Sequence, residues 1–163
     1  MLKIIAVIFL TVALVWTISA QTVLAKVTDF LNHSYPGWKQ APGACDSRKW
    51  VLTGDFDGDG RRDYLVRVKT GKTAKTMRLN LIAFFGSEDG KYPVKQILDD
   101  ALTNDMLRSS FSVIKKGTRI QLGEGEGLTV ALKHDAASQY ICQTDAIKTM
   151  VFESGKWSNI YDR

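Results

Sequence analysis

The chain has 163 residues, of which 45% are hydrophobic and 24% are charged. This length allows one domain with a real core, and the composition excludes a disordered chain. A net charge of +5 at pH 7 is only mildly basic, so it favours solubility and does not indicate a nucleic-acid partner.

Residues 1–25 have the composition of a secretory signal peptide. Lys3 is their only charge, an apolar run extends from Ile4 to Trp16, and small residues follow. We expect cleavage after Ala25, with Ala20 as the alternative. An uncleaved anchor is disfavoured because polar residues dilute the end of the run. The sequence thus predicts a secreted or periplasmic chain, with no membrane attachment after cleavage and a net charge lowered to +4 by the loss of Lys3.

Residues 26–163 predict a single exported β-rich domain. A short helix is expected over residues 26–34, and Pro36 and Gly37 end it because both residues break regular structure. Residues 36–48 read as a loop.

Strand patterns dominate after this loop. Residues 63–69 alternate in polarity, which places Arg67 and Lys69 on a solvent-facing side. The strand over residues 92–98 contains Pro93, which lacks an amide donor, so this strand is expected at a sheet edge or starts there. Further strands are predicted over residues 49–54, 78–85, 111–115, 118–122, 128–134, 138–143, 146–153 and 156–162.

A second short helix is predicted over residues 99–110, with Asp99 or Asp100 as its cap. The aromatic residues Phe152, Trp157 and Tyr161 are expected to close the core. The fold class is therefore mainly β, an antiparallel domain with one or two short helices.

The two cysteines, Cys45 and Cys142, predict a disulfide. An even pair in an exported chain is expected to join. The bridge would close a loop of almost one hundred residues, which the chain-entropy model values at about 4 to 5 kcal/mol. Two separate buried thiols are the alternative.

The stretch TGDFDGDGRRDYLV, residues 53–66, crowds four aspartates into nine residues. The acids Asp55, Asp57, Asp59 and Asp63 take loop positions 1, 3, 5 and 9, so alternate side chains can point inward. Hard cations such as Ca²⁺ prefer six to eight oxygen ligands, and the carbonyl of Arg61 at position 7 would add one. Gly60 permits the sharp turn. The stretch therefore predicts a Ca²⁺ site, but not an EF-hand, because strands flank the loop and Val66 takes position 12.

Residues 50–95 resemble the FG-GAP and VCBS repeats of β-propeller proteins. The acidic loop is followed by the apolar strand DYLVRV, a second strand LNLIAFFG and the Gly/Asp-rich turn SEDGKY. The resemblance implies blade-like hairpins around one Ca²⁺ loop, with the four aspartates as side-chain ligands and Arg61 as the carbonyl ligand. The motif occurs once, whereas propellers need several blades. The resemblance therefore implies a single repeat within a small exported domain.

Other polar groups give weaker indications. His33 and His134 lack the spacing of metal ligands and are predicted as core or surface residues. Ser109 or Ser110 could complete a triad with His134 and Asp135, but no nucleophile-elbow motif supports it. The glycine- and glutamate-rich residues 123–127 predict a loop.

Two functions follow from these features. The first is a non-enzymatic, Ca²⁺-stabilised β module that binds a protein or glycan in the periplasm or outside the cell. The alternative is a metal-dependent hydrolase of phosphate esters or glycans, in which the aspartates would hold a catalytic ion with an open position. The absence of a catalytic motif favours the first. The sequence leaves the partner and the oligomeric state open.

Overall fold

A computed structural model describes residues 24–45, 49–73, 76–101, 108–121, 129–144 and 147–161, with the backbone alone for residues 95–101 and 161. The chain divides into two compact units, Met1–Trp38 and Lys39–Arg163. The predicted signal peptide lies outside the described residues except for Leu24 and Ala25, and residues 123–127 lie outside them altogether.

The first unit is helical over residues 24–34, which confirms the predicted short helix. Val27 and Leu31, one helical turn apart, are buried. The indole of Trp38 donates a 2.9 Å hydrogen bond to the side-chain oxygen of Asn32. None of the described helices is long and apolar enough to cross a membrane.

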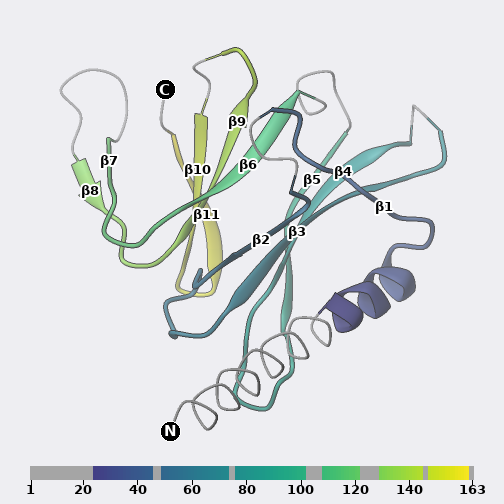
Figure 1. Ribbon diagram of the computed structural model, residues 1–163, viewed down its shortest axis with the longest axis horizontal. Helices are drawn as coiled ribbons and strands as arrows, with labels where there is room; N and C mark the ends of the chain where they lie inside the picture. Colours follow the sequence, from purple (N-terminus) through teal and green to yellow (C-terminus); the bar gives the residue numbers. More distant parts are fainter. Residues whose placement is uncertain are drawn as a thin grey trace, which may run out of the picture. The chain divides into compact units, whose positions relative to one another are not determined.

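The second unit consists of antiparallel β-sheets (Figure 1). One sheet has the order β1-β3-β4-β5, with β2 also paired to β3; a second has the order β11-β10-β9-β6; and β7 pairs with β8. The strands are β1 (Lys39–Gln40), β2 (Val51–Gly54), β3 (Asp63–Thr70), β4 (Arg78–Phe84), β5 (Val94–Ala101), β6 (Ser109–Ile114), β7 (Arg119–Gln121), β8 (Thr129–Ala131), β9 (Ala136–Ile141), β10 (Ile147–Glu153) and β11 (Lys156–Tyr161).

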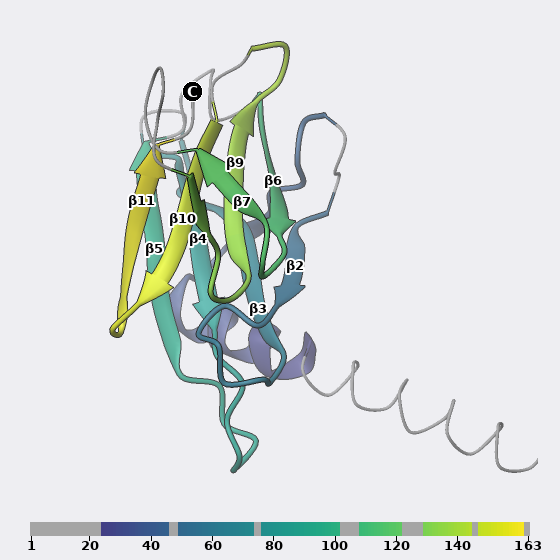
Figure 2. The same cartoon turned by 90° about the vertical axis from the view of Figure 1, so that its left-hand side faces the viewer.

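The five-stranded and four-stranded sheets form two layers, as Figure 2 shows. One buried cluster takes residues from both sheets, so the layers share a core. Phe152 belongs to it and the partly buried Trp157 packs against it, with ring centroids 5.3 Å apart, as the sequence predicted for these two residues. The side chain of Tyr161, predicted to join them, lies outside the described residues. Its buried members are Leu52, Phe56, Leu65, Leu81, Ala83, Phe85, Phe111, Ala137, Met150 and Phe152.

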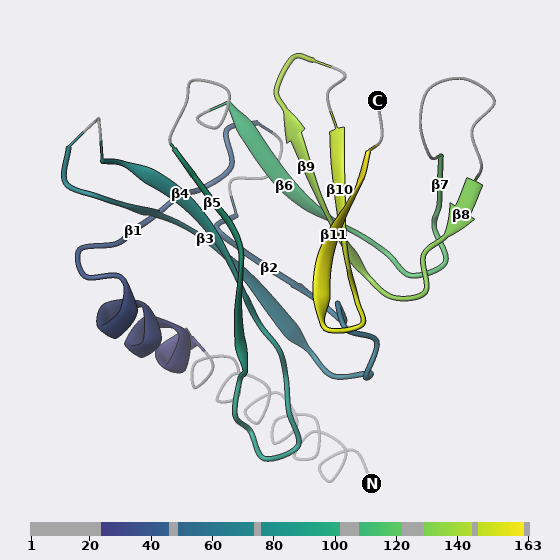
Figure 3. The same cartoon turned by 180° about the vertical axis from the view of Figure 1, so that it is seen from behind.

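The β7–β8 hairpin lies beside the four-stranded sheet (Figure 3). A second cluster, formed by Ile120, Leu132, Ala136 and Val151, joins the hairpin to this sheet. The connection between β8 and β9, residues 132–135, begins at Leu132 of this cluster and leads into β9 at Ala136.

The predicted helix over residues 99–110 is wrong where the structure describes it. Residues 99–101 continue β5, where Asp99 pairs with Asn80 and Asp100 with Leu79, and residues 109–110 begin β6. The backbone groups that a helix would satisfy locally are satisfied here by β4, so long-range pairing overrides a capping pattern. The edge position of β5 is confirmed, and Pro93 directly precedes it.

Arg67 does not face solvent, contrary to the prediction. The side chain is only 4% exposed. Its guanidinium donates hydrogen bonds to the carbonyl of Pro42 at 2.9 Å and to the hydroxyl of Ser109 at 2.9 Å, and it lies 5.2 Å from the centre of the Phe111 ring. Polarity alternation misassigns this strand because these acceptors come from distant segments and satisfy the buried charge.

Residues 36–48, predicted as a loop, contain the short strand β1, which pairs with β3. The Arg67 guanidinium donates to the carbonyls of Ala41 and Pro42 and so holds the segment that directly follows β1. The predicted disulfide is confirmed: Cys45 and Cys142 are joined, with their Cα atoms 5.9 Å apart. The bridge links this segment to the turn after β9. The Cys45 amide also donates to the Ser110 hydroxyl at 3.0 Å, which ties the same segment to β6.

Candidate metal site

The acidic loop connects β2 to β3, whose register pairs Gly54 with Asp63. The loop is anchored by a buried aromatic residue between two of its aspartates. Phe56 is 0% exposed and belongs to the core shared by both sheets, where its ring lies 6.2 Å from that of Trp157. Because Phe56 points into the core, the flanking aspartates are directed away from it.

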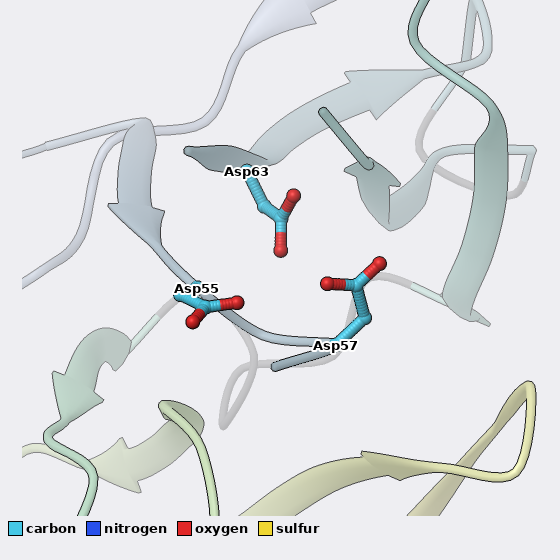
Figure 4. A group of neighbouring side chains, drawn as sticks. All are labelled: Asp55, Asp57 and Asp63. Carbon is cyan, nitrogen blue, oxygen red and sulfur yellow. The ribbon is translucent and has the colours of Figure 1, made fainter. Parts of the chain in front are cut away.

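Three of the four aspartates converge. Asp55, Asp57 and Asp63 each present a carboxylate oxygen, and these oxygens all lie within 4.8 Å of one another. Figure 4 shows the three side chains pointing toward a common space. Two oxygens bound to one Ca²⁺ at 2.3–2.6 Å can be up to about 5 Å apart. The donor set therefore fits a hard divalent cation.

Backbone amides fix the position of Asp55. Its two carboxylate oxygens accept hydrogen bonds from the amides of Gly58 at 2.9 Å and Gly60 at 3.2 Å. Both glycines have φ of +82°, a left-handed conformation that other residues rarely adopt. The predicted turn at Gly60 is thus present, and Gly58 adds a second one.

Asp63 is the most deeply buried acid of the loop, at 0% exposure. Its carboxylate accepts from the amides of Phe56 at 2.7 Å and Gly86 at 2.8 Å. Burial raises the pKa of Asp63 to about 6 even though both hydrogen bonds favour the charged form. A carboxylate has about four acceptor positions, so these bonds leave capacity for a cation.

Asp57 is half-buried, and two nearby aspartates affect the pKa of its carboxylate. Burial raises its pKa, and the charges of Asp59 and Asp55 raise it further. A raised pKa in a crowded acidic loop means that the ionised form is disfavoured, so a bound cation would relieve that cost.

Asp59, predicted as a side-chain ligand, instead pairs with Arg61. The Asp59 carboxylate accepts from the amide and the guanidinium of Arg61, both at 2.7 Å, and does not join the converging group. Although burial opposes it, Arg61 lowers the pKa of Asp59. The ligand roles of Asp59 and of the Arg61 carbonyl stay predictions.

The structure adds residues that sequence reasoning did not place at the site. Gly86 approaches so closely that a Cβ would lie 2.7 Å from the carbonyl oxygen of Arg62. Asp135 and His134 come from the β8–β9 connection; the amide of Asp135 donates to the carbonyl of Asp55 at 2.9 Å. No local pattern signals these contacts. Gly86 reaches the loop through the pairing of β3 with β4, and Asp135 and His134 reach it through the packing of the two sheets.

Two cavities flank the loop. One, of about 380 Å³, has a mixed-charge lining: Thr53, Gly54, Asp55, Gly60, Arg61, Arg62, Lys115 and Asp135. The other, of about 300 Å³, is lined by Asp57, Lys133, His134, Phe152, Glu153, Ser154 and Gly155. The Ser109 hydroxyl accepts from Arg67 and the Ser110 hydroxyl from the Cys45 amide, whereas the His134 ring bonds the carbonyl of Phe152. These contacts give no support to a triad among the described residues.

No protein-family model, curated protein or solved structure matches the chain. The FG-GAP and VCBS resemblance therefore rests on the loop motif and the strands that follow it, and it stays a prediction.

Proposed function

We propose that the protein is an exported, non-enzymatic β module whose acidic loop binds one Ca²⁺ for stability and which binds a protein or glycan outside the cytoplasm. The convergence of Asp55, Asp57 and Asp63 carries the proposal. These carboxylates belong to a loop anchored in the core by Phe56, so a cation bound there would stabilise the packing of both sheets.

A structural role for the ion has more support than a catalytic one. Catalytic ions need an open position beside groups that act on a substrate. Here Asp63 is buried and bonded to two amides, and the nearby histidine donates its ring N–H to the carbonyl of Phe152. These contacts hold structure in place, and such ions in extracellular modules bind with a Kd of about 0.1–1 mM.

Export is supported by the disulfide and by the leader-like residues 1–25. Disulfides persist in oxidising compartments, and the Cys45–Cys142 bridge joins residues 97 positions apart. Cleavage of the leader would remove Lys3 and leave the acidic loop and the disulfide in the exported domain.

The cavity beside Arg61, Arg62 and Lys115 is the place where we expect a partner to contact the module. Its lining mixes both charges, which suits hydrogen-bonding groups of a protein or glycan better than an apolar ligand.

Thermal melting tests the proposal. The chelator-treated protein should melt at a higher temperature after Ca²⁺ is added, and Mg²⁺ should give a smaller shift because it demands a tighter octahedral site. Asp55→Ala should abolish the Ca²⁺ shift. A melting temperature that does not respond to Ca²⁺ would refute the proposal.

A further inference from the structure

Asp135 makes a reciprocal contact with the acidic loop from the other sheet. Its amide donates to the carbonyl of Asp55 at 2.9 Å, and its carboxylate accepts from the amide of Asp55 at 3.2 Å. The two residues are 80 positions apart in sequence. Asp135 directly precedes β9 of the four-stranded sheet, whereas Asp55 directly follows β2 of the five-stranded sheet.

The Asp135 carboxylate accepts from two further donors, one on the oxygen that also binds the Asp55 amide and one on the other oxygen. Lys115 donates from its ammonium group at 2.7 Å, and the amide of Lys116 donates at 3.0 Å. The residue is only 7% exposed. Burial would raise its pKa, but the bonds from Lys115, Lys116 and Asp55 lower it, so the carboxylate stays ionised at neutral pH.

The backbone of the loop and its flanking strand packs closely against this contact. A Cβ on Gly54 would lie 2.9 Å from the Asp135 carboxylate and 2.8 Å from the Phe56 ring. A Cβ on Gly58 would lie 3.3 Å from the His134 ring, which is itself bonded to the carbonyl of Phe152. Asp135 and His134 therefore approach the backbone at Gly54, the last residue of β2, and at Gly58 in the loop so closely that a side chain at either position would crowd them.

We infer that Asp135 is a positioning residue for the cation site. It holds the backbone of Asp55 in the conformation that directs the Asp55 carboxylate toward Asp57 and Asp63, and it couples cation binding to the four-stranded sheet. This inference rests on the proposed function, since it requires that the loop bind a divalent cation. Residues that orient metal ligands typically change metal affinity by about 10- to 100-fold when mutated.

Asp135→Asn tests the inference, with Asp89→Asn as the matched control. Asp89 also accepts from a lysine ammonium and a backbone amide, both of Lys91, but it lies outside the converging group. Calorimetric Ca²⁺ titrations should show a Kd raised about 10-fold in Asp135→Asn and unchanged in Asp89→Asn. The melting shift at a fixed Ca²⁺ concentration should shrink only in Asp135→Asn.

The outcomes separate the two claims. If the wild type binds Ca²⁺ and Asp135→Asn binds it with wild-type affinity, Asp135 has only a structural role and the inference is overturned. If the wild type does not bind Ca²⁺, the proposed function fails first, and the inference fails with it.

Amide hydrogen exchange on the wild type covers the case in which Asp135→Asn does not fold. Ca²⁺ should slow exchange at the amides of Asp135 and Lys116 as well as at Gly58 and Gly60 of the loop. The Lys91 amide, which donates to Asp89, should not respond. Protection confined to the loop amides would overturn the coupling.

Discussion

Two acidic segments of the same sheet shift the pKa values of their carboxylates in opposite directions. In the acidic loop, Asp55, Asp57 and Asp63 converge, and burial raises the pKa of Asp63 to about 6. In the turn over residues 86–91, Asp89 pairs with Lys91, and hydrogen bonds from Lys91 and Ser87 lower its pKa to about 2.

The difference shows that acid content alone does not make a cation site. In the turn, the ammonium group of Lys91 lies two residues after Asp89 and compensates the charge of its carboxylate locally. The loop gathers acids around a buried aromatic anchor, so its charge is compensated by hydrogen bonds and, in our proposal, by Ca²⁺.

Removal of the buried acid should cost the most stability. Asp63→Ala leaves the amides of Phe56 and Gly86 without their acceptor. Each buried amide that loses its partner costs about 1–3 kcal/mol, so the two amides predict a loss of about 2–6 kcal/mol in the free energy of unfolding. Urea denaturation measures it. Asp89→Ala, the control in the exposed turn, should lower the midpoint much less, because solvent screens its pair with Lys91; equal losses in both variants would contradict the contrast.

Neutralising Asp57 should separate cation affinity from stability. Asp57→Asn removes one charged ligand and should raise the Kd for Ca²⁺ at least about 10-fold, because ligand charge tunes affinity in such sites. In chelator, the same variant should melt no lower than the wild type, because burial and the charges of Asp59 and Asp55 disfavour the ionised group. A melting temperature in chelator well below the wild-type value would show that the acids do not repel.

The pH dependence of stability should have opposite signs in the two segments. In the cation-free protein, the raised pKa of Asp63 means that protonation favours the fold. Its contribution to stability is present below the usual pKa of 3.8 and is lost as pH rises through about 6. The lowered pKa of Asp89 means that its contribution is present above 3.8 and is lost as pH falls through about 2.

Melting curves in chelator across this pH range measure both effects. Asp63→Asn should flatten the profile between about pH 4 and 6, and Asp89→Asn should flatten it between about pH 4 and 2. Saturating Ca²⁺ should remove the Asp63 slope, because the cation holds that carboxylate ionised. A slope between pH 4 and 6 that persists in Asp63→Asn would assign it to another group.

The smallest effect should come from Glu88, which bridges the two segments by pairing with Arg61 at 2.5 Å. This pair is exposed, so solvent and salt screen it. Glu88→Gln should leave the urea midpoint and the Ca²⁺ affinity close to those of the wild type at physiological salt. A large loss of affinity would mean that Arg61 must be held away from the loop for the cation to bind.

The sequence predicted most of the strands because their patterns are local. Alternating polarity and Pro93 before the edge strand both lie within a few positions of the element they define. The loop acids were found for the same reason, since three of the four that the spacing identified converge.

The predictions that failed depend on distant partners. Residues 99–101 extend β5 because β4 supplies their hydrogen bonds. Arg67 is buried because Pro42 and Ser109 accept its hydrogen bonds and the Phe111 ring lies under its guanidinium. Asp135 reaches the loop only through the packing of two sheets. Periodicity carries no information on such pairings.

Calorimetric titration of Ca²⁺ into the chelator-treated protein, with Asp55→Ala titrated in parallel, shows whether the acidic loop is a cation site. We expect one Ca²⁺ per chain with a Kd of about 0.1–1 mM and no binding to Asp55→Ala. No heat of binding in the wild type, or equal binding in the variant, would contradict the claim that Asp55, Asp57 and Asp63 form a cation site.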